Sequence, residues 1–168
     1  EYRFNNSQIA FLRDLGLEAP LATTNFWGDN KLFCLPALSM GGLIDAHSYG
    51  QEEALSRNPL YESNFIANIA CAQVADMPLT ISEWNVPYPA RDRFTAPLYV
   101  SSIASLQGWD APMLYNYSQD ALGLPHHPRK WSTFADPAFV ALTPAAALAY
   151  RRGDIAPAKR HFCFTPAH

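Results

Sequence analysis

The sequence predicts an α/β fold in which strands and helices alternate along the chain and the strands lie parallel. Four short runs with apolar, β-branched and aromatic content are each followed by a segment of helical or apolar character. Parallel neighbours need a long connection, usually a helix, and this order of elements provides it. The 168 residues are 49% hydrophobic and 16% charged, a composition that is typical of packed globular chains and excludes disorder.

The first half of the chain predicts an opening helix and two strands. Asn6 can cap a helix over 7–15, where apolar residues recur at helical spacing. The runs 21–28 and 43–49 have the residue types of strands, and the apolar segment 32–40 lies between them.

The second half repeats this alternation. Asn58 followed by Pro59 predicts a helix start, with an apolar stripe that continues to about residue 77. Asp136 before Pro137 opens the last helix in the same way. The strands predicted in this half are 79–85 and 111–118, and the further helices are 95–107 and 136–152.

Charge and motifs exclude several classes of function. The net charge is −3 and the basic residues form no run longer than Arg151 and Arg152, so we expect no nucleic-acid partner. We find no membrane-spanning run, no signal peptide in the first residues, and no phosphate loop or dinucleotide fingerprint, so we expect no membrane and no cofactor. The compartment stays open. We expect three small buried cysteines, without zinc or redox spacing: Cys34, Cys71 and Cys163.

Polar and aromatic side chains concentrate where the predicted strands end. In parallel β/α folds these carboxyl ends form the open, functional face of the sheet. Aromatic rings beside hydrogen-bonding groups suit sugars, which stack through their C–H faces and need donors and acceptors for their hydroxyls. The segments at the four strand ends are 25–28, 45–50, 82–85 and 115–118.

Glu83 is the acidic residue that we single out. It follows the apolar pair Leu79 and Ile81, so its carboxylate should emerge at the mouth of the sheet in a partly desolvated place. Position alone does not distinguish a catalytic carboxylate from a structural ion pair or a solvated loop acid.

Two short motifs on successive strands resemble the glycoside hydrolases of clan A, the superfamily of cellulases, mannanases and β-galactosidases. The run 81–85, Ile-Ser-Glu-Trp-Asn, is similar to the end of that clan's seventh strand, and His47-Ser48-Tyr49 is similar to the His-x-Tyr element of the sixth. The resemblance implies a retaining mechanism on β-linked glycans, with Glu83 as nucleophile and Tyr49 and His47 beside it. It implies sugar contacts from six further residues: Asn25, Trp27, Trp84, Asn85, Tyr115 and Tyr117.

By the same resemblance, residues 1–153 correspond to the C-terminal half of a (β/α)8 barrel, with strands five to eight, and 154–168 to a linker or the start of a following module. The clan's acid/base glutamate follows an Asn on the fourth strand, and no Asn-Glu pair occurs in this sequence. We therefore expect a partner, either a complementary half barrel or a second copy in a homo-oligomer, because a half barrel exposes sheet edges. An oligo- or polysaccharide is the expected substrate.

Two alternatives remain open at this point. One is a catalytically incompetent half barrel that only binds carbohydrate or self-associates. The other is a metal-dependent barrel hydrolase, since Asp45 and His47 alternate on one strand face, although no further metal ligand stands out on other strands.

Overall fold

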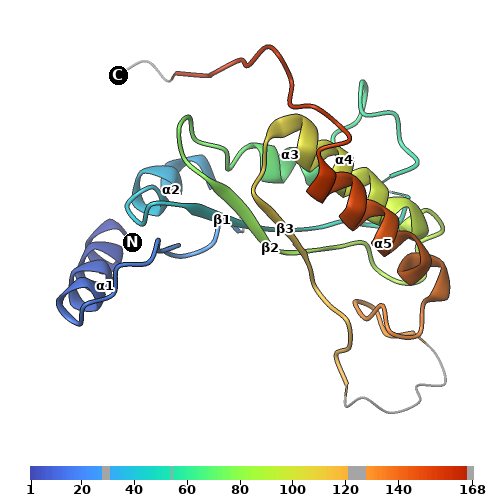
Figure 1. Cartoon of the computed structure of the whole chain (residues 1–168), viewed down its shortest axis with the longest axis horizontal. Coiled ribbons are helices and arrows are strands. Elements are labelled where there is room, and N and C mark those ends of the chain that lie inside the picture. Colours follow the sequence, from blue (N-terminus) through green and yellow to red (C-terminus); the bar gives the residue numbers. More distant parts are fainter. Residues whose placement is uncertain (28–30, 54, 121–127, 166–168) are drawn as a thin grey trace.

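Three parallel strands form the centre of the molecule, in the spatial order β1, β2, β3 (Figure 1). They are β1 (Ile44–Tyr49), β2 (Leu79–Asn85) and β3 (Ala111–Leu114), and each pairs in parallel with its neighbour. The computed structural model describes residues 1–27, 31–53, 55–120 and 128–165. The prediction of a mixed α/β chain with parallel strands is therefore confirmed, in the form of a small three-stranded sheet.

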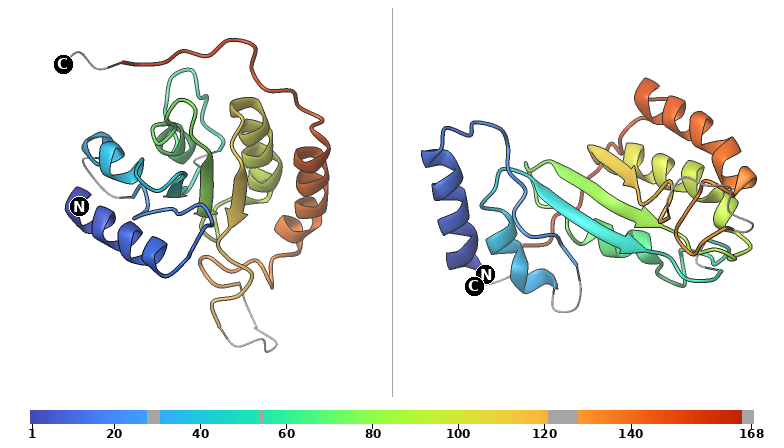
Figure 2. Two further views of the ribbon diagram at one scale, coloured as in Figure 1. Left: turned by 60° about the vertical axis from the view of Figure 1, so that its left-hand side comes forward. Right: turned by 90° about the horizontal axis from the view of Figure 1, so that it is seen from below.

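Helices precede, separate and follow the strands. Figure 2 shows α1 and α5 at opposite ends of the molecule, with the sheet between them. Residues 154–165 form neither helix nor strand. Among the described residues, no helix is both long enough and apolar enough to cross a membrane. The helices are α1 (Tyr2–Asp14), α2 (Lys31–Leu38), α3 (Phe65–Ala70), the 3-10 helix η1 (Arg93–Thr95), α4 (Ala96–Gln107) and α5 (Pro137–Arg152).

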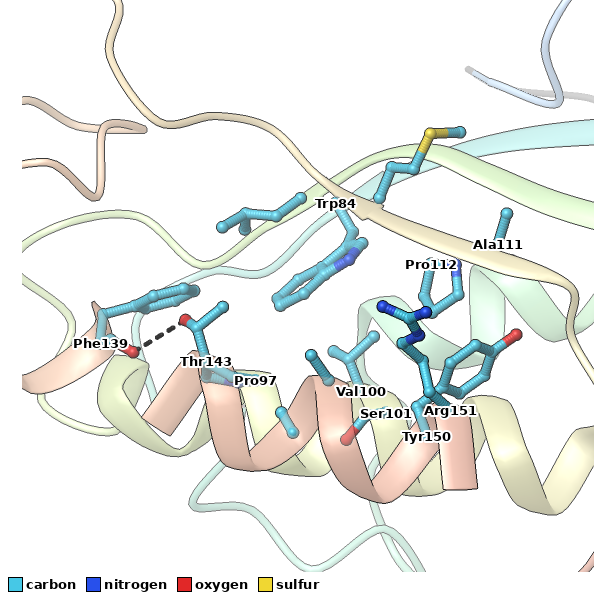
Figure 3. A pocket seen from close by; sticks show the side chains of 14 residues that line it. Trp84, Pro97, Val100, Ser101, Ala111, Pro112, Phe139, Thr143, Tyr150 and Arg151 are labelled. Carbon is cyan, nitrogen blue, oxygen red and sulfur yellow. Dashed lines mark hydrogen bonds between the residues drawn. The ribbon is translucent and has the colours of Figure 1, made fainter. Parts of the chain in front are cut away.

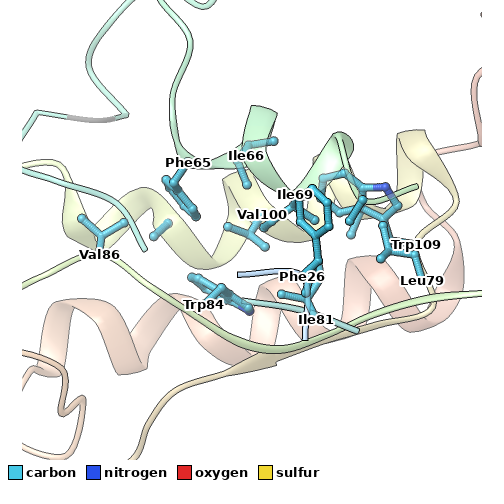
Figure 4. Close-up of a cluster of buried hydrophobic side chains, with 14 of the residues drawn as sticks. Phe26, Phe65, Ile66, Ile69, Leu79, Ile81, Trp84, Val86, Val100 and Trp109 are labelled. Atoms are coloured by element: carbon cyan, nitrogen blue, oxygen red, sulfur yellow. The ribbon is translucent and has the colours of Figure 1, made fainter. Parts of the chain in front are cut away.

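One face of the sheet makes the hydrophobic core. Strand residues alternate between the two faces, so Ile44 and Ala46 of β1 point to the same side as Ile81 of β2, and all three are buried. They belong to one buried cluster together with helix residues such as Ile69 of α3 and Val100 of α4. Figure 4 shows Ile81, Ile69 and Val100 in this cluster. The opposite face of the sheet is left for polar side chains.

The prediction of a strand over 21–28 is wrong for residues 21–27, and Gly28 lies outside the described residues. Only two isolated parallel bridges form, Leu21 to Gly42 and Phe26 to Ala46. Phe26 is buried and anchors this segment beside β1, but the residues between the two bridges form no continuous ladder. The segment therefore lies along β1 without becoming a fourth strand.

Two further expectations need correction. The helix predicted over 58–77 is reduced to α3, because Asn58 accepts a hydrogen bond from the Leu60 amide in a local turn while Asn64 caps the helix by accepting from the Ile66 amide. Cys71 and Cys163 are exposed rather than buried, and Cys34 is partly buried. Cys71 is the C-cap residue of α3.

Candidate active site

The polar face of the sheet is built by alternate residues of β1. Asp45, His47 and Tyr49 share one face, opposite to the buried Ala46, and lead toward the carboxyl end of the strand. His47 and Tyr49 are partly exposed, whereas Asp45 is only 3% exposed. The His-x-Tyr element therefore places both of its functional side chains on the side away from the helices.

A bulge in β2 brings Glu83 to this same face. Ala46 pairs with Ile81 but His47 pairs with Glu83, so Ser82 is an extra residue in β2. Regular alternation from Ile81 would send Glu83 into the hydrophobic core. Because of the bulge, Ser82 and Glu83 both lie on the polar face, and the Glu83 side chain is 32% exposed.

The Glu83 carboxylate is held by the two β1 residues that the motif predicted. Tyr49 Oη donates a hydrogen bond to Glu83 Oε2, and His47 Nδ1 lies 3.3 Å from the same oxygen. Burial raises the pKa of Tyr49, and the hydrogen bond to Glu83 raises it further, so this phenol stays a protonated donor through the neutral range. Within the described residues, the polar contacts of the carboxylate that the structure records fall on Oε2.

Aromatic rings surround Tyr49. The Trp27 and Tyr115 rings meet Tyr49 edge-on, with ring centroids 5.7 and 6.1 Å away, and the Trp131 ring lies at 4.7 Å. Trp27 also contacts His47 at 6.3 Å and is 59% exposed. We call Trp27, Tyr49, Tyr115 and Trp131 the aromatic cluster. It places a carboxylate beside several ring faces, an arrangement that suits a sugar ring.

Trp131 is the member of this cluster that the sequence did not predict. It lies in the segment 128–136, well after β3, and no local pattern shows where that segment returns to the sheet. Asn85 explains its position: its side-chain amide donates to the Trp131 carbonyl at 2.7 Å and to the Tyr115 carbonyl. Asn85 is fully buried in this structure and connects the segment of Trp131 to Tyr115.

Arg93 ties the same segment to η1. Its guanidinium donates to the carbonyl oxygens of Lys130 at 3.1 Å and Ser132 at 2.7 Å, and Nε lies 2.9 Å from an oxygen of Asp136. The group also lies over the Phe139 ring, 5.0 Å from its centroid. Burial lowers the pKa of Arg93, and the pairing with Asp136 opposes that effect.

Three other predicted site residues do not reach the carboxylate directly. Trp84 is 5% exposed and packs against Phe139 with centroids 6.3 Å apart, on the helix side of the sheet, because the bulge sends it there. Tyr117 is exposed and contacts Phe134 at 5.2 Å instead of joining the aromatic cluster. Asn25 donates a hydrogen bond from its side-chain amide to Asp45, so it contacts the site through Asp45 and not through Glu83.

Comparisons with known proteins give no relative for this chain: no family model, no curated protein and no solved structure matches it. Among the described residues, no group of three or more His, Cys, Asp or Glu side chains is arranged to hold a metal ion. Function is therefore argued from the geometry of Glu83 and its surroundings.

Proposed function

We propose that this chain carries the nucleophile part of a retaining glycosidase site that acts on β-linked glycans, with Glu83 as the nucleophile. The observation that supports this most is the carboxylate itself, which is partly exposed at the end of β2 and held through one oxygen by Tyr49 and His47. A nucleophilic carboxylate needs such orientation, because attack on an anomeric carbon requires a fixed approach.

The aromatic cluster supports a sugar as the ligand. Trp27 is exposed, and Trp131 and Tyr115 are partly exposed, so ring surface is accessible within reach of the Glu83 carboxylate. Sugars bury their C–H faces on such rings and place hydroxyls toward polar groups. His47 and Tyr49 supply polar atoms at the same place.

Covalent trapping tests the proposed function directly. The chain is incubated with dinitrophenyl 2-deoxy-2-fluoro-β-glycosides of glucose, galactose and mannose, whose leaving group needs no protonation by a general acid. We expect one sugar per chain, located on the Glu83 peptide by mass spectrometry, and no label in Glu83→Gln. A chain that stays unlabelled with all three sugars contradicts the nucleophile, and binding of β-glycans without labelling would favour the carbohydrate-binding alternative.

Trp131 provides a prediction about the kcat/KM of the proposed reaction. Removing its ring in Trp131→Ala should lower kcat/KM for an aryl β-glycoside about tenfold, because one aromatic stacking contact is worth roughly 1.4 kcal/mol. The control is Tyr61→Ala, an exposed ring outside the aromatic cluster, which should leave kcat/KM unchanged. Equal losses in both variants would show that the effect does not come from stacking at the site.

We also propose that the sheet is completed by a complementary half barrel or a second copy of the chain. Beyond β3 no further strand follows within the described residues, so one edge of β3 carries unpaired backbone groups. A largely apolar cavity of about 260 Å3 opens there, between β3 and helices α4 and α5 (Figure 3). Trp84 Nε1 lines it and finds no acceptor in the part of the chain described. An added strand would cover the edge and supply acceptors.

A charge on β3 tests this association. Met113 is 48% exposed on β3, and Met113→Asp should abolish self-association or pairing with an added half barrel, as measured by light scattering. The control is Leu148→Asp on α5, which is 58% exposed and outside the residues that line the cavity. A wild-type chain that remains a compact monomer at high concentration, and binds no complementary half, contradicts the proposal.

A further inference from the structure

Asp45 is a buried carboxylate beneath the site, and hydrogen-bond donors occupy both of its oxygens. Oδ1 accepts from Thr80 Oγ1 at 2.6 Å and from the Ser82 amide at 2.9 Å, while Oδ2 accepts from Ser82 Oγ and from the Asn25 side chain. A carboxylate that is 3% exposed has little access to water, so its oxygens need such donors from the protein. Two of these donors belong to Ser82, the extra residue of the bulge.

The bulge therefore depends on Asp45. Ser82 is held through its backbone amide by one oxygen of Asp45 and through its hydroxyl by the other. The bulge is what turns Glu83 away from the core and onto the face of His47. Asp45 thus controls the direction of Glu83 without touching it.

The same contacts determine which nitrogen of His47 carries a proton. The Ser82 hydroxyl has one proton, and it donates that proton to Asp45. Ser82 Oγ also lies 2.8 Å from His47 Nε2, so Nε2 must be the donor in that contact. Asp45 Oδ2, at 3.5 Å from Nε2, favours the same assignment.

We infer that Asp45 is a positioning residue that acts through Ser82, holding the bulge that presents Glu83 and fixing the proton of His47 on Nε2. His47 Nδ1, the other ring nitrogen, lies 3.3 Å from Glu83 Oε2, so the tautomer of His47 decides what the ring presents to the carboxylate. The catalytic meaning of this pair rests on the proposed function, whereas the proton position on Nε2 does not.

The substitution Asp45→Asn separates this role from simple stability. The Ser82 amide and Thr80 hydroxyl keep the new carbonyl oxygen in the place of Oδ1, so the new NH2 takes the place of Oδ2. There it donates to Ser82 Oγ, and the exposed Asn25 side chain turns its carbonyl oxygen toward the NH2 in place of its own amide nitrogen. The Ser82 proton must then turn to His47 Nε2, which becomes an acceptor. His47 can now donate from Nδ1 to Glu83 as a neutral imidazole.

Long-range 1H–15N spectra of the full chain with 15N-labelled histidine measure this change. The chain has five histidines, and the His47 signals are assigned by their loss in His47→Gln. We expect a protonated Nε2 in the wild type and an unprotonated Nε2 in Asp45→Asn. The control is Thr80→Val, which removes another hydrogen bond to Asp45 but leaves Ser82 in place, and should keep Nε2 protonated.

Each outcome decides. A folded Asp45→Asn chain in which His47 Nε2 is still protonated overturns the inference. If that variant does not fold, the wild-type spectrum tests the inference by itself, because an unprotonated Nε2 there overturns it. In turnover of an aryl β-glycoside, Asp45→Asn should lower kcat about tenfold or more with KM nearly unchanged, and Thr80→Val should not. A changed Nε2 together with an unlabelled Glu83 in the trapping experiment would reject the proposed function and keep the proton assignment.

Discussion

Replacing Glu83 by alanine should lower kcat for a dinitrophenyl β-glycoside by about 10⁴-fold or more, as expected when the nucleophile of a covalent mechanism is removed. The variant cannot form the glycosyl-enzyme intermediate, and Tyr49 and His47 lose the oxygen that they hold. Because Glu83 is partly exposed, we expect the folded chain to survive, with little change in its melting temperature.

Added azide or formate should restore part of the lost rate. A small anion can occupy the space of the missing carboxylate and attack the anomeric carbon from the same side, so the azide product should have the inverted, α configuration. Product configuration by NMR measures this. The control variant is Glu62→Ala, an exposed carboxylate paired with Arg57 at 3.0 Å, which should keep full activity and show no response to azide. Wild-type rates in Glu83→Ala would remove Glu83 from the mechanism.

The elements that could be predicted from the sequence are those with strong local end signals. The strand predicted over 79–85 matches β2, and the helix predicted over 136–152 matches α5 within one residue. Asp136 caps α5 by accepting a hydrogen bond from the Phe139 amide, and Gly153 ends it with a φ of 67°. Side-chain caps and a left-handed glycine act locally, so they are visible without tertiary information.

The predictions for the segment 21–28 and for the start of α3 are wrong for the opposite reason, because both features depend on tertiary contacts. β-branched and aromatic content favours a strand, but a strand also needs a regular ladder. The described residues of this segment form two isolated bridges, from Leu21 to Gly42 and from Phe26 to Ala46 of β1. Asn58 can serve a local turn as readily as a helix cap, and Asn64 is the residue that caps α3. Both asparagines offer the same local signal, and the packing of Phe65 and Ile69 in the core favours the second.

Within the site, the motif predicted the hydrogen bond between Tyr49 and Glu83, which the structure contains. His47 was predicted nearby and lies 3.3 Å from the same carboxylate oxygen. It could not predict which way each side chain points, since a single extra residue at Ser82 reverses the faces of Glu83 and Trp84. A bulge depends on contacts from the neighbouring strand, here from Asp45, and therefore leaves no local pattern in β2. The return of Trp131 to the sheet is likewise fixed by distant donors.

Arg93→Ala should destabilise the chain by about 3–5 kcal/mol, because it removes one partner of a buried ion pair. Arg93 is 2% exposed and Asp136 is 13% exposed, so the remaining carboxylate cannot be fully rehydrated, although the amide of Phe139 still donates to it. The carbonyl oxygens of Lys130 and Ser132 also lose their donors. Urea unfolding, followed by circular dichroism, measures the free energy of unfolding.

The matched control is Arg57→Ala, which breaks the pair with Glu62 at 3.0 Å. Both of its side chains are at least 50% exposed, and solvent screening limits such a pair to about 1 kcal/mol or less. Arg93→Lys keeps the charge but cannot reach two carbonyls and Asp136 together, so its stability should fall between wild type and Arg93→Ala. Since Arg93 holds the segment that carries Trp131, protease cleavage within 128–136 should also accelerate in Arg93→Ala and not in Arg57→Ala. Equal stability losses in both alanine variants would mean that the segment is held by Asn85 and packing, without a contribution from the buried pair.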